Sequence, residues 1–528
     1  MKKFNITTTC IPEKHYMVDT STKIDKIIEM LIEERLYFTI NRARQFGKTT
    51  TIAKLEKKLS DKYMVISISF EGKSYLFKDE ESFASGIFGL FSESFRFTDK
   101  ETYAKLLKYG ATDMKSMKDV SSEITRLCDE NEKEIILMID EVDKASNFVV
   151  FMDFIGELRA KYIAASSNKD KTFKSVILAG VSDIKNLKVH ISDRRILTEN
   201  EAEKLQKGEY NSPWNVAADF DIDMSFNPEE IATMLVEYEA DHKTGMNIGE
   251  MSEEIYSYTS GYPFLVSKLC KVIDEKIDKR FTKEGLQEAV KEILYEQNTL
   301  FTDLIKNLEN NEELYKLVEK IILEGETVDF NIDEPTINRA VMYSILKKDE
   351  SRKLSVHNRI FETRIYNYMI SKKEVAETIR VNYESRNQFI KKDGDLDILK
   401  LLEKFQELMK EEYREETEEF VEKKGRLIFL AFMKPIINGT GFYDVEVETR
   451  TNKRMDIMVT YNRKRYIIEL KIWHGKAYEE RGYNQLAEYM EIKNEKEGYM
   501  VVFSFNKSKK YTREWVEVKG KRIYEVIV

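Results

Sequence analysis

Residues 42–49 read Arg42-Ala43-Arg44-Gln45-Phe46-Gly47-Lys48-Thr49 and lie between two segments of different character. The preceding run, Leu36–Ile40, is apolar and typical of a buried strand, whereas Thr50–Lys58 is predicted to be a helix. A Gly-Lys-Thr at such a junction suits phosphate, because loop N–H groups and the helix N-terminus point at the same place. The full phosphate-loop pattern asks for another glycine where this chain has Arg42.

The loop predicts ATP and Mg²⁺ as cofactors. Lys48 would neutralise charge on the β- and γ-phosphates, and the Thr49 hydroxyl would be a ligand of Mg²⁺. The tripeptide alone also occurs by chance. A second motif is therefore needed to support the interpretation.

The apolar run Ile135–Ile139 leads directly into Asp140 and Glu141. Two carboxylates at the end of a buried strand suit the magnesium side of a phosphate-loop ATPase. Asp140 would hold Mg²⁺ through water, and Glu141 would orient or deprotonate the attacking water. The alternative is a buried strand that ends at a solvated acidic loop.

Further strands are predicted at Met64–Phe70 and Ser175–Ala179, and amphipathic helices separate the strands. This alternation predicts an α/β core at residues 1–225, with a parallel sheet covered by helices on both faces. Ser182 follows the last strand and is a candidate sensor of the γ-phosphate, although a simple turn explains it equally well. Arg194 and Arg195 are either fingers for a neighbouring site in a homo-oligomer or surface residues.

The order of three motifs resembles the bacterial predicted AAA-ATPase-like family. They are Tyr16-Met17-Val18-Asp19, the loop at 42–49 and Ile139-Asp140-Glu141. The family loop typically reads Arg-Pro-Arg-Arg-Phe-Gly-Lys-Ser, so Arg42 in place of glycine is a family trait, and Ala43, Gln45 and Thr49 depart from it. The resemblance covers about residues 10–290. It implies a nucleotide-binding set of Arg44, Phe46, Gly47, Lys48, Thr49, Thr50 and Asp140.

Three later motifs are also similar to that family: Gly180-Val181-Ser182, Ser212-Pro213-Trp214-Asn215 and Gly261-Tyr262-Pro263-Phe264. The Gly-Tyr-Pro turn looks like the Gly-x-Pro lid element of signalling ATPases. By that resemblance Pro263 contacts the base or ribose. Residues 226–300 are accordingly predicted to be a helical lid, and Asn227-Pro228 is a good helix start.

The remaining chain is predicted to hold three further parts. Residues 301–375 read as short helices followed by a strand and suggest a winged helix. Residues 376–414 are very charged and are predicted to be a helical connector, with a solvated acidic run at 411–419. Residues 415–528 return to an α/β pattern, predicted to be a separate domain.

In this last part, Asp456 and Glu469 lie on two predicted strands joined by a turn at Tyr461–Lys464. A two-residue hairpin loop would place Asp456 opposite Glu469, with Lys471 on the same face. The other face would be apolar and buried. Facing carboxylates repel unless a divalent metal, Mg²⁺ or Mn²⁺, lies between them. The alternative is an ordinary polar hairpin face with a Glu–Lys pair.

Asp456, the Glu469-x-Lys471 spacing and a following helix with Gln485 and Tyr489 resemble the PD-(D/E)XK nuclease superfamily. The usual proline before the aspartate is Met455 here. The match covers about residues 415–510. The resemblance implies a restriction-endonuclease-like fold, metal ligands Asp456 and Glu469, and catalytic roles for Lys471 and Gln485. It also assigns Glu422 to the acidic position of the first core helix, and Met500–Phe505 to the last core strand.

Composition limits the classes of function. The 528 residues are 42% apolar and 34% charged, with net charge −9, which argues against coating nucleic acid over the whole surface. Two interpretations of Lys507, Lys509 and Lys510 stay open: local contacts with nucleic acid, or a cluster of lysines exposed to solvent. No run of about 18 apolar residues predicts a membrane span. Three scattered cysteines and no apolar leader predict a cytoplasmic protein.

Together the motifs predict an ATP-binding and ATP-hydrolysing protein coupled to a Mg²⁺-dependent nuclease that acts on DNA or RNA. The alternative is an ATP-dependent switch whose C-terminal domain binds nucleic acid or a protein partner without cleavage.

Overall fold

The computed structural model describes most of the chain, in ranges that are separated by gaps. The ranges are 2–111, 113–146, 148–181, 214–323, 326–375, 386–412, 422–437, 441–448, 454–461, 464–473, 476–504 and 509–528. For some residues inside them, Glu422 and Asp456 among them, only the backbone is described. The chain forms two compact units, Met1–Leu300 with Asn338–Leu346, and Phe301–Ile337 with Lys347–Val528.

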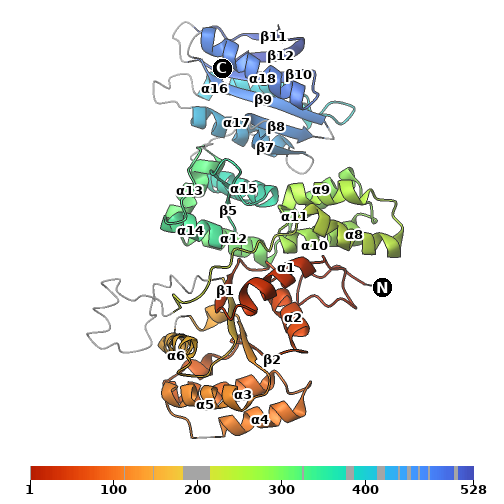
Figure 1. The fold of residues 1–528 in the computed structure, drawn as a ribbon. Helices are drawn as coiled ribbons and strands as arrows, with labels where there is room; N and C mark the ends of the chain where they lie inside the picture. The colour runs from red at the N-terminus through yellow and green to blue at the C-terminus, as the bar shows by residue number, and fades with distance from the viewer. Residues whose placement is uncertain are drawn as a thin grey trace, which may run out of the picture. The chain divides into compact units, whose positions relative to one another are not determined.

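The first unit contains a parallel sheet in the order β1-β4-β3-β2 (Figure 1). Its strands are β1 (Phe38–Asn41), β2 (Met64–Ser69), β3 (Ile135–Asp140) and β4 (Ser175–Gly180). In register, Ile40 pairs with Ala179, and Ile139 pairs with Leu178. The predicted strands and their parallel arrangement are confirmed. Because β4 lies between β1 and β3, their carboxyl ends meet at one edge, where ligands of such sheets bind.

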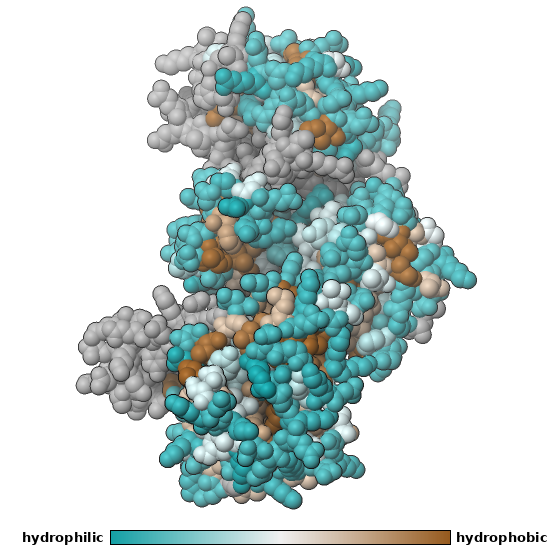
Figure 2. Space-filling view, viewed as in Figure 1, coloured by the Kyte–Doolittle hydropathy of each residue, from teal (hydrophilic) through white to brown (hydrophobic). Residues whose placement is uncertain are grey.

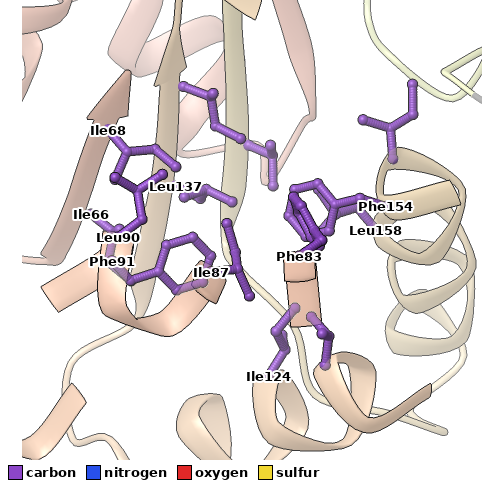
Figure 3. Close-up of a cluster of buried hydrophobic side chains, with 14 of the residues drawn as sticks. Ile66, Ile68, Phe83, Ile87, Leu90, Phe91, Ile124, Leu137, Phe154 and Leu158 are labelled. Carbon is purple, nitrogen blue, oxygen red and sulfur yellow. The ribbon is translucent and has the colours of Figure 1, made fainter. Parts of the chain in front are cut away.

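Helices cover both faces of this sheet. On one face, α2 (Lys48–Leu59) contacts β2, β3 and β4, and α1 (Ser21–Ile27) packs against α2. On the other face lie α3 (Glu80–Glu93), α5 (Met117–Glu130) and α6 (Val149–Ser166), with α4 (Lys100–Gly110) outside α3. Figure 3 shows side chains of these helices meeting those of β2 and β3 in an apolar core. This core holds the sheet rigid behind the edge described below.

Four helices follow in the first unit, as predicted for the lid segment. They are α8 (Pro228–His242), α9 (Ile248–Thr259), α10 (Pro263–Lys276) and α11 (Lys283–Tyr295). The predicted start of α8 is confirmed, because the Asn227 side chain accepts from the N–H of Glu230 and the Glu230 carboxylate accepts from the N–H of Asn227.

After the lid segment, the chain forms helices and a small two-stranded sheet. The elements are α12 (Thr299–Glu309), α13 (Glu312–Ile322), α14 (Pro335–Met342), β5 (Leu346–Lys348), β6 (Leu354–Val356) and α15 (Arg359–Val375). Helices followed by a short β-hairpin and a helix are compatible with the winged helix, which stays a prediction.

The second unit also contains a six-stranded sheet in the order β11-β12-β10-β9-β8-β7. The strands are β7 (Gly441–Glu448), β8 (Arg454–Tyr461), β9 (Lys464–Ile472), β10 (Glu497–Phe503), β11 (Arg513–Val518) and β12 (Lys521–Ile527). Helix α18 (Lys476–Ile492) contacts β9, β10 and β12, and α17 (Glu422–Ile437) contacts β9. The sheet holds two strands that the sequence did not predict, because β11 and β12 follow β10 and β12 pairs with β10. The assignment of β10 as the last core strand stays a prediction.

Two further features of this sheet differ from the expectation. Helix α16 (Ile398–Glu412) begins inside the stretch predicted to be a connector, yet Phe405 packs on Phe429, Phe432 and Phe503. The hairpin was expected to bury one face only. Both faces are buried, because α18 covers the face that carries Ile467 and Glu469.

Hydrophilic side chains dominate the face of the molecule drawn in Figure 2, and apolar residues gather there in small patches. None of the helices in the described ranges is long and apolar enough to cross a bilayer.

Candidate functional site

The loop between β1 and α2 has the backbone conformation that phosphate binding requires. Gly47 is the N-cap of α2 with φ 82°, and Gln45 is also left-handed with φ 59°. Left-handed residues beside helical ones turn successive N–H groups to one side, which forms an anion-binding concavity. The dipole of the twelve-residue helix α2 adds positive potential at the same place.

Lys48, the first residue of α2, crosses this loop and is nearly buried. Its Nζ donates to the carbonyl oxygens of Arg42, at 2.9 Å, and Ala43, at 3.0 Å. Burial lowers the pKa of Lys48, although Asp143, Asp140 and Glu141 act in the opposite direction. The ammonium is therefore positioned by loop carbonyls, in a place where phosphate oxygens would stabilise its charge.

Thr49 and Asp140 meet at the shared carboxyl edge of β1 and β3. The Thr49 hydroxyl donates to Asp140 Oδ2 at 2.7 Å, and the N–H of Glu141 donates to Asp140 Oδ1 at 2.9 Å. A hydroxyl and a carboxylate fit Mg²⁺, which takes few protein ligands and is completed by phosphate and water. The described residues contain no cluster of three or more His, Cys, Asp or Glu side chains suited to a metal.

Glu141 follows Asp140 in a left-handed conformation, with φ 55°. Partial burial raises the pKa of Glu141, and the negative charge of Asp140 raises it further. A carboxylate with a raised pKa is a better proton acceptor than an exposed one, as a general base requires.

Asp143 belongs to the same edge and was not predicted. Its Oδ2 accepts from the N–H of Val181 at 2.6 Å, which ties the turn after β3 to the end of β4. A Cβ at Gly180 would lie 3.0 Å from both Asp143 carboxylate oxygens and 2.7 Å from Val142 Cγ2, so the close approach requires glycine. The feature of the sequence that could have identified Asp143 is that it is the third carboxylate near the end of β3.

The Gly-Tyr-Pro turn before α10 touches the phosphate loop. The hydroxyl of buried Tyr262 donates to Arg44 O at 2.6 Å, and its ring packs edge-on against Phe46 with centroids 4.8 Å apart. Pro263 lies about 4.0 Å from where a Cβ of Gly47 would be. Tyr262 was not predicted as a site residue. The Gly-Tyr-Pro motif predicted a contact with the nucleotide for its proline only.

A cavity of about 560 Å³ opens beside the loop. It is lined by Arg44, Phe46, Gly47, Lys48, Thr49, Thr50, Glu141 and Pro263, all predicted for the site, and also by the N-terminal segment Asn5–Cys10. Cavities of this size hold small ligands and cofactors. The remaining candidates Ser182, Arg194 and Arg195 lie outside the described residues.

The C-terminal hairpin has the predicted register. Thr460 pairs with Arg465 and Ile457 with Ile468, so the next position places Asp456 opposite Glu469. Glu469 has no exposed surface, and its Oε1 lies 3.0 Å from the Nζ of Lys471. This distance is short enough for an ion pair. Glu469 and Lys471 therefore lie together as predicted, under a helix.

The helix α18 carries the other expected residues of this domain. Gln485 Nε2 donates to Tyr489 Oη at 2.9 Å, as expected for residues four apart on one helical face. An unpredicted carboxylate, Glu525 on β12, accepts from the Tyr483 hydroxyl at 2.5 Å. Glu422 is the first residue of α17, and its side chain is outside the described set, like that of Asp456.

A parallel sheet with a phosphate loop after β1 and a magnesium-type carboxylate after β3 defines the class of P-loop ATPases. Within this class, residues 27–190 match the family model described as predicted AAA-ATPase. No curated protein sequence matches the chain.

The solved structures that are similar to this chain include the Walker-type ATPase PABY2304 of Pyrococcus abyssi. The two chains are 12% identical with a TM-score of 0.44, and the match covers 69% of this chain and 99% of the other. The ORC2 protein of Aeropyrum pernix, in ADPNP–ADP complexes, is 11% identical over 68% and 93%, with TM-score 0.34. The site is assigned from its own geometry and the family match.

Proposed function

We propose that the chain binds ATP with Mg²⁺ at the phosphate loop and hydrolyses it. The hydrogen bond between Thr49 and Asp140 carries this proposal, because it brings together the hydroxyl of a helix residue and the carboxylate at the end of β3, beside Lys48. Thr49 and Asp140 would hold Mg²⁺, which would supply positive charge to offset that of the phosphates. Lys48 would bind the phosphates, and Glu141 would accept a proton from the attacking water.

The test compares Lys48→Ala with Lys58→Ala, which alters an exposed lysine at the far end of α2. We expect Lys48→Ala to abolish binding of a fluorescent ATP analogue, because the phosphate charge loses its partner. Lys58→Ala should bind like the unchanged protein. Binding retained by Lys48→Ala would refute the assignment of the loop.

We propose further that the C-terminal domain is a Mg²⁺- or Mn²⁺-dependent nuclease for DNA or RNA whose activity depends on the nucleotide state. The support is the hairpin register of Asp456 and Glu469 and the proximity of Lys471. In this proposal the two carboxylates hold the metal, Lys471 stabilises the charge that develops on the phosphodiester, and Gln485 and Glu422 orient these groups.

One observation favours the alternative, a switch whose C-terminal domain binds nucleic acid or a protein partner without cleavage. Glu469 is fully buried under α18, and a metal-bound phosphodiester needs access to both carboxylates. In the alternative, the Glu469–Lys471 pair is a buried ion pair that stabilises the domain.

Plasmid DNA and RNA separate the two functions. Each substrate is incubated with the protein and Mg²⁺ or Mn²⁺, with and without ATP, beside the variants Lys471→Ala and Lys496→Ala. Lys496 is an exposed lysine before β10 and serves as the matched control. Metal-dependent cutting that only Lys471→Ala loses supports the nuclease. Intact substrate in every reaction, with ATP turnover preserved, supports the switch.

A further inference from the structure

The turn after Glu141 brings a lysine to the cavity. Val142–Lys144 form a 3-10 turn in which the N–H of Lys144 donates to the carbonyl of Glu141 at 3.0 Å. Side chains three residues apart on a 3-10 helix eclipse one another. Accordingly Glu141 and Lys144 both line the cavity, while Val142 between them is fully buried.

Three of the other cations that line the cavity already contact protein groups. Lys23 pairs with Glu230 at 2.7 Å, and Lys54 donates to Thr20 Oγ1 at 2.7 Å. Lys48 binds the loop carbonyls described above. Within the described ranges, Lys144 forms no ion pair, and its side chain is exposed at the cavity wall.

We infer that Lys144 is a catalytic residue of ATP hydrolysis, which contacts the γ-phosphate from the same chain. The inference rests on the proposed hydrolysis. In the reaction, the oxygen of water forms a bond to the γ-phosphorus, and the bond from that phosphorus to the β–γ bridging oxygen breaks. The electron pair of the broken bond stays on ADP, and Glu141 accepts the proton of the water. Lys144 donates to γ-phosphate oxygens whose charge shifts in the transition state.

This assignment has a consequence for assembly. Many ATPases of related chemistry obtain such a cation in trans, from another molecule. A cation supplied by the same turn as the general base makes turnover per chain independent of protein concentration.

The experiment measures ATP turnover and nucleotide affinity for the unchanged protein, Lys144→Ala, Lys144→Arg and Lys169→Ala. Lys169 is exposed in the turn before β4, at the opposite edge of the sheet, and is the matched control. Removal of one transition-state donor lowers kcat by about 100-fold or more. We expect that loss in Lys144→Ala, with affinity for a non-hydrolysable ATP analogue unchanged within about threefold. Lys144→Arg should retain part of the turnover that Lys144→Ala loses. Lys169→Ala should turn over ATP as fast as the unchanged protein.

Three outcomes overturn the inference. Turnover by Lys144→Ala equal to that of the unchanged protein removes Lys144 from the reaction. A loss of affinity equal to the loss of rate makes it a binding residue only. Turnover per chain that rises with protein concentration, and is retained by Lys144→Ala, assigns the cation to a neighbouring molecule. An unchanged protein that binds ATP without any turnover would instead refute the proposed hydrolysis, and the inference with it.

Discussion

Thr49 and Asp140 are 91 positions apart, yet a single hydrogen bond joins them where Mg²⁺ is expected. Because threonine contributes only its hydroxyl to this arrangement, the methyl group is dispensable. We therefore expect Thr49→Ser to retain Mg²⁺-dependent ATP binding. Thr49→Val, which has the same shape without the hydroxyl, should lose about 1.5–3 kcal/mol of interaction with a charged partner, and hence about ten- to a hundredfold in Mg²⁺ affinity. Titration of Mg²⁺ against bound ATP analogue measures this difference. Equal affinities in the two variants would contradict it.

Glu141 gives the ATPase an expected pH dependence. Its pKa is raised, first by burial and then by Asp140, so its carboxylate takes up a proton at a higher pH than an exposed glutamate does. A protonated Glu141 does not accept a proton from water. Turnover should consequently fall as the pH is lowered through this raised pKa, on the acidic side of the profile.

The charge of Glu71 also raises the pKa of Glu141, although less than burial, Asp140 and Asp143 do. Glu71→Gln should accordingly move the acidic limb of the kcat profile to lower pH. A shift to higher pH, or a profile without an acidic limb, would argue against Glu141 as the base.

At the scale of elements, the start of α10 depends on one glycine. Gly261 has φ 70°, and a Cβ there would lie 1.9 Å from the carbonyl oxygen of Phe226. The N–H of Phe226 in turn donates to Gly261 O at 2.9 Å. This close approach sets the position of Tyr262, and through it the contact between the start of α10 and Arg44.

Gly261→Ala should destabilise the first unit by about 2 kcal/mol or more, because left-handed strain and a backbone clash add. The matched control is Gly245→Ala, which has φ 77° and open space around the Cβ position. It should cost only the left-handed strain, about 1–2 kcal/mol. Thermal or denaturant unfolding measures both. Gly261→Ala as stable as Gly245→Ala would show that the backbone yields at this position.

Tyr262→Phe tests the same contact more gently. It removes the donor to Arg44 O and leaves the packing against Phe46. The net loss of one such hydrogen bond costs about 0.5–1.5 kcal/mol of the free energy of unfolding. We therefore expect weaker affinity for ATP together with a small drop in Tm, measured by titration and by thermal melting. Unchanged affinity would mean that the contact between Tyr262 and Arg44 does not support the loop.

For the whole molecule, the two compact units predict separate unfolding transitions in calorimetry. The nucleotide cavity is lined entirely by residues of the first unit. A ligand stabilises the state that binds it by about 2.7 kcal/mol at a hundredfold excess over Kd. ATP with Mg²⁺ should therefore raise the Tm of one transition and leave the other in place. A single transition that moves as a whole with ATP would contradict this prediction.

Local patterns in the sequence were sufficient for the phosphate loop, the carboxylates after β3, the four strands of the first sheet and the register of the β8–β9 hairpin. Each of these depends on residues that are close in the chain, where strand and helix periodicity and turn length dictate which side chains share a face. The register predicted by counting outward from a two-residue loop is the one observed from Tyr461 and Lys464 to Ile457 and Ile468.

Other features were decided only by the tertiary structure. The burial of Glu469 depends on how the next helix, α18, folds back over β9. The tie between Asp143 and Val181 and the hydroxyl of Tyr262 on Arg44 join segments that are distant in the chain. The same is true of α16, which packs Phe405 on the C-terminal domain. Such contacts depend on how apolar faces of different segments are brought together. The periodicity of one segment indicates which of its faces is buried, but it does not indicate which other segment covers that face.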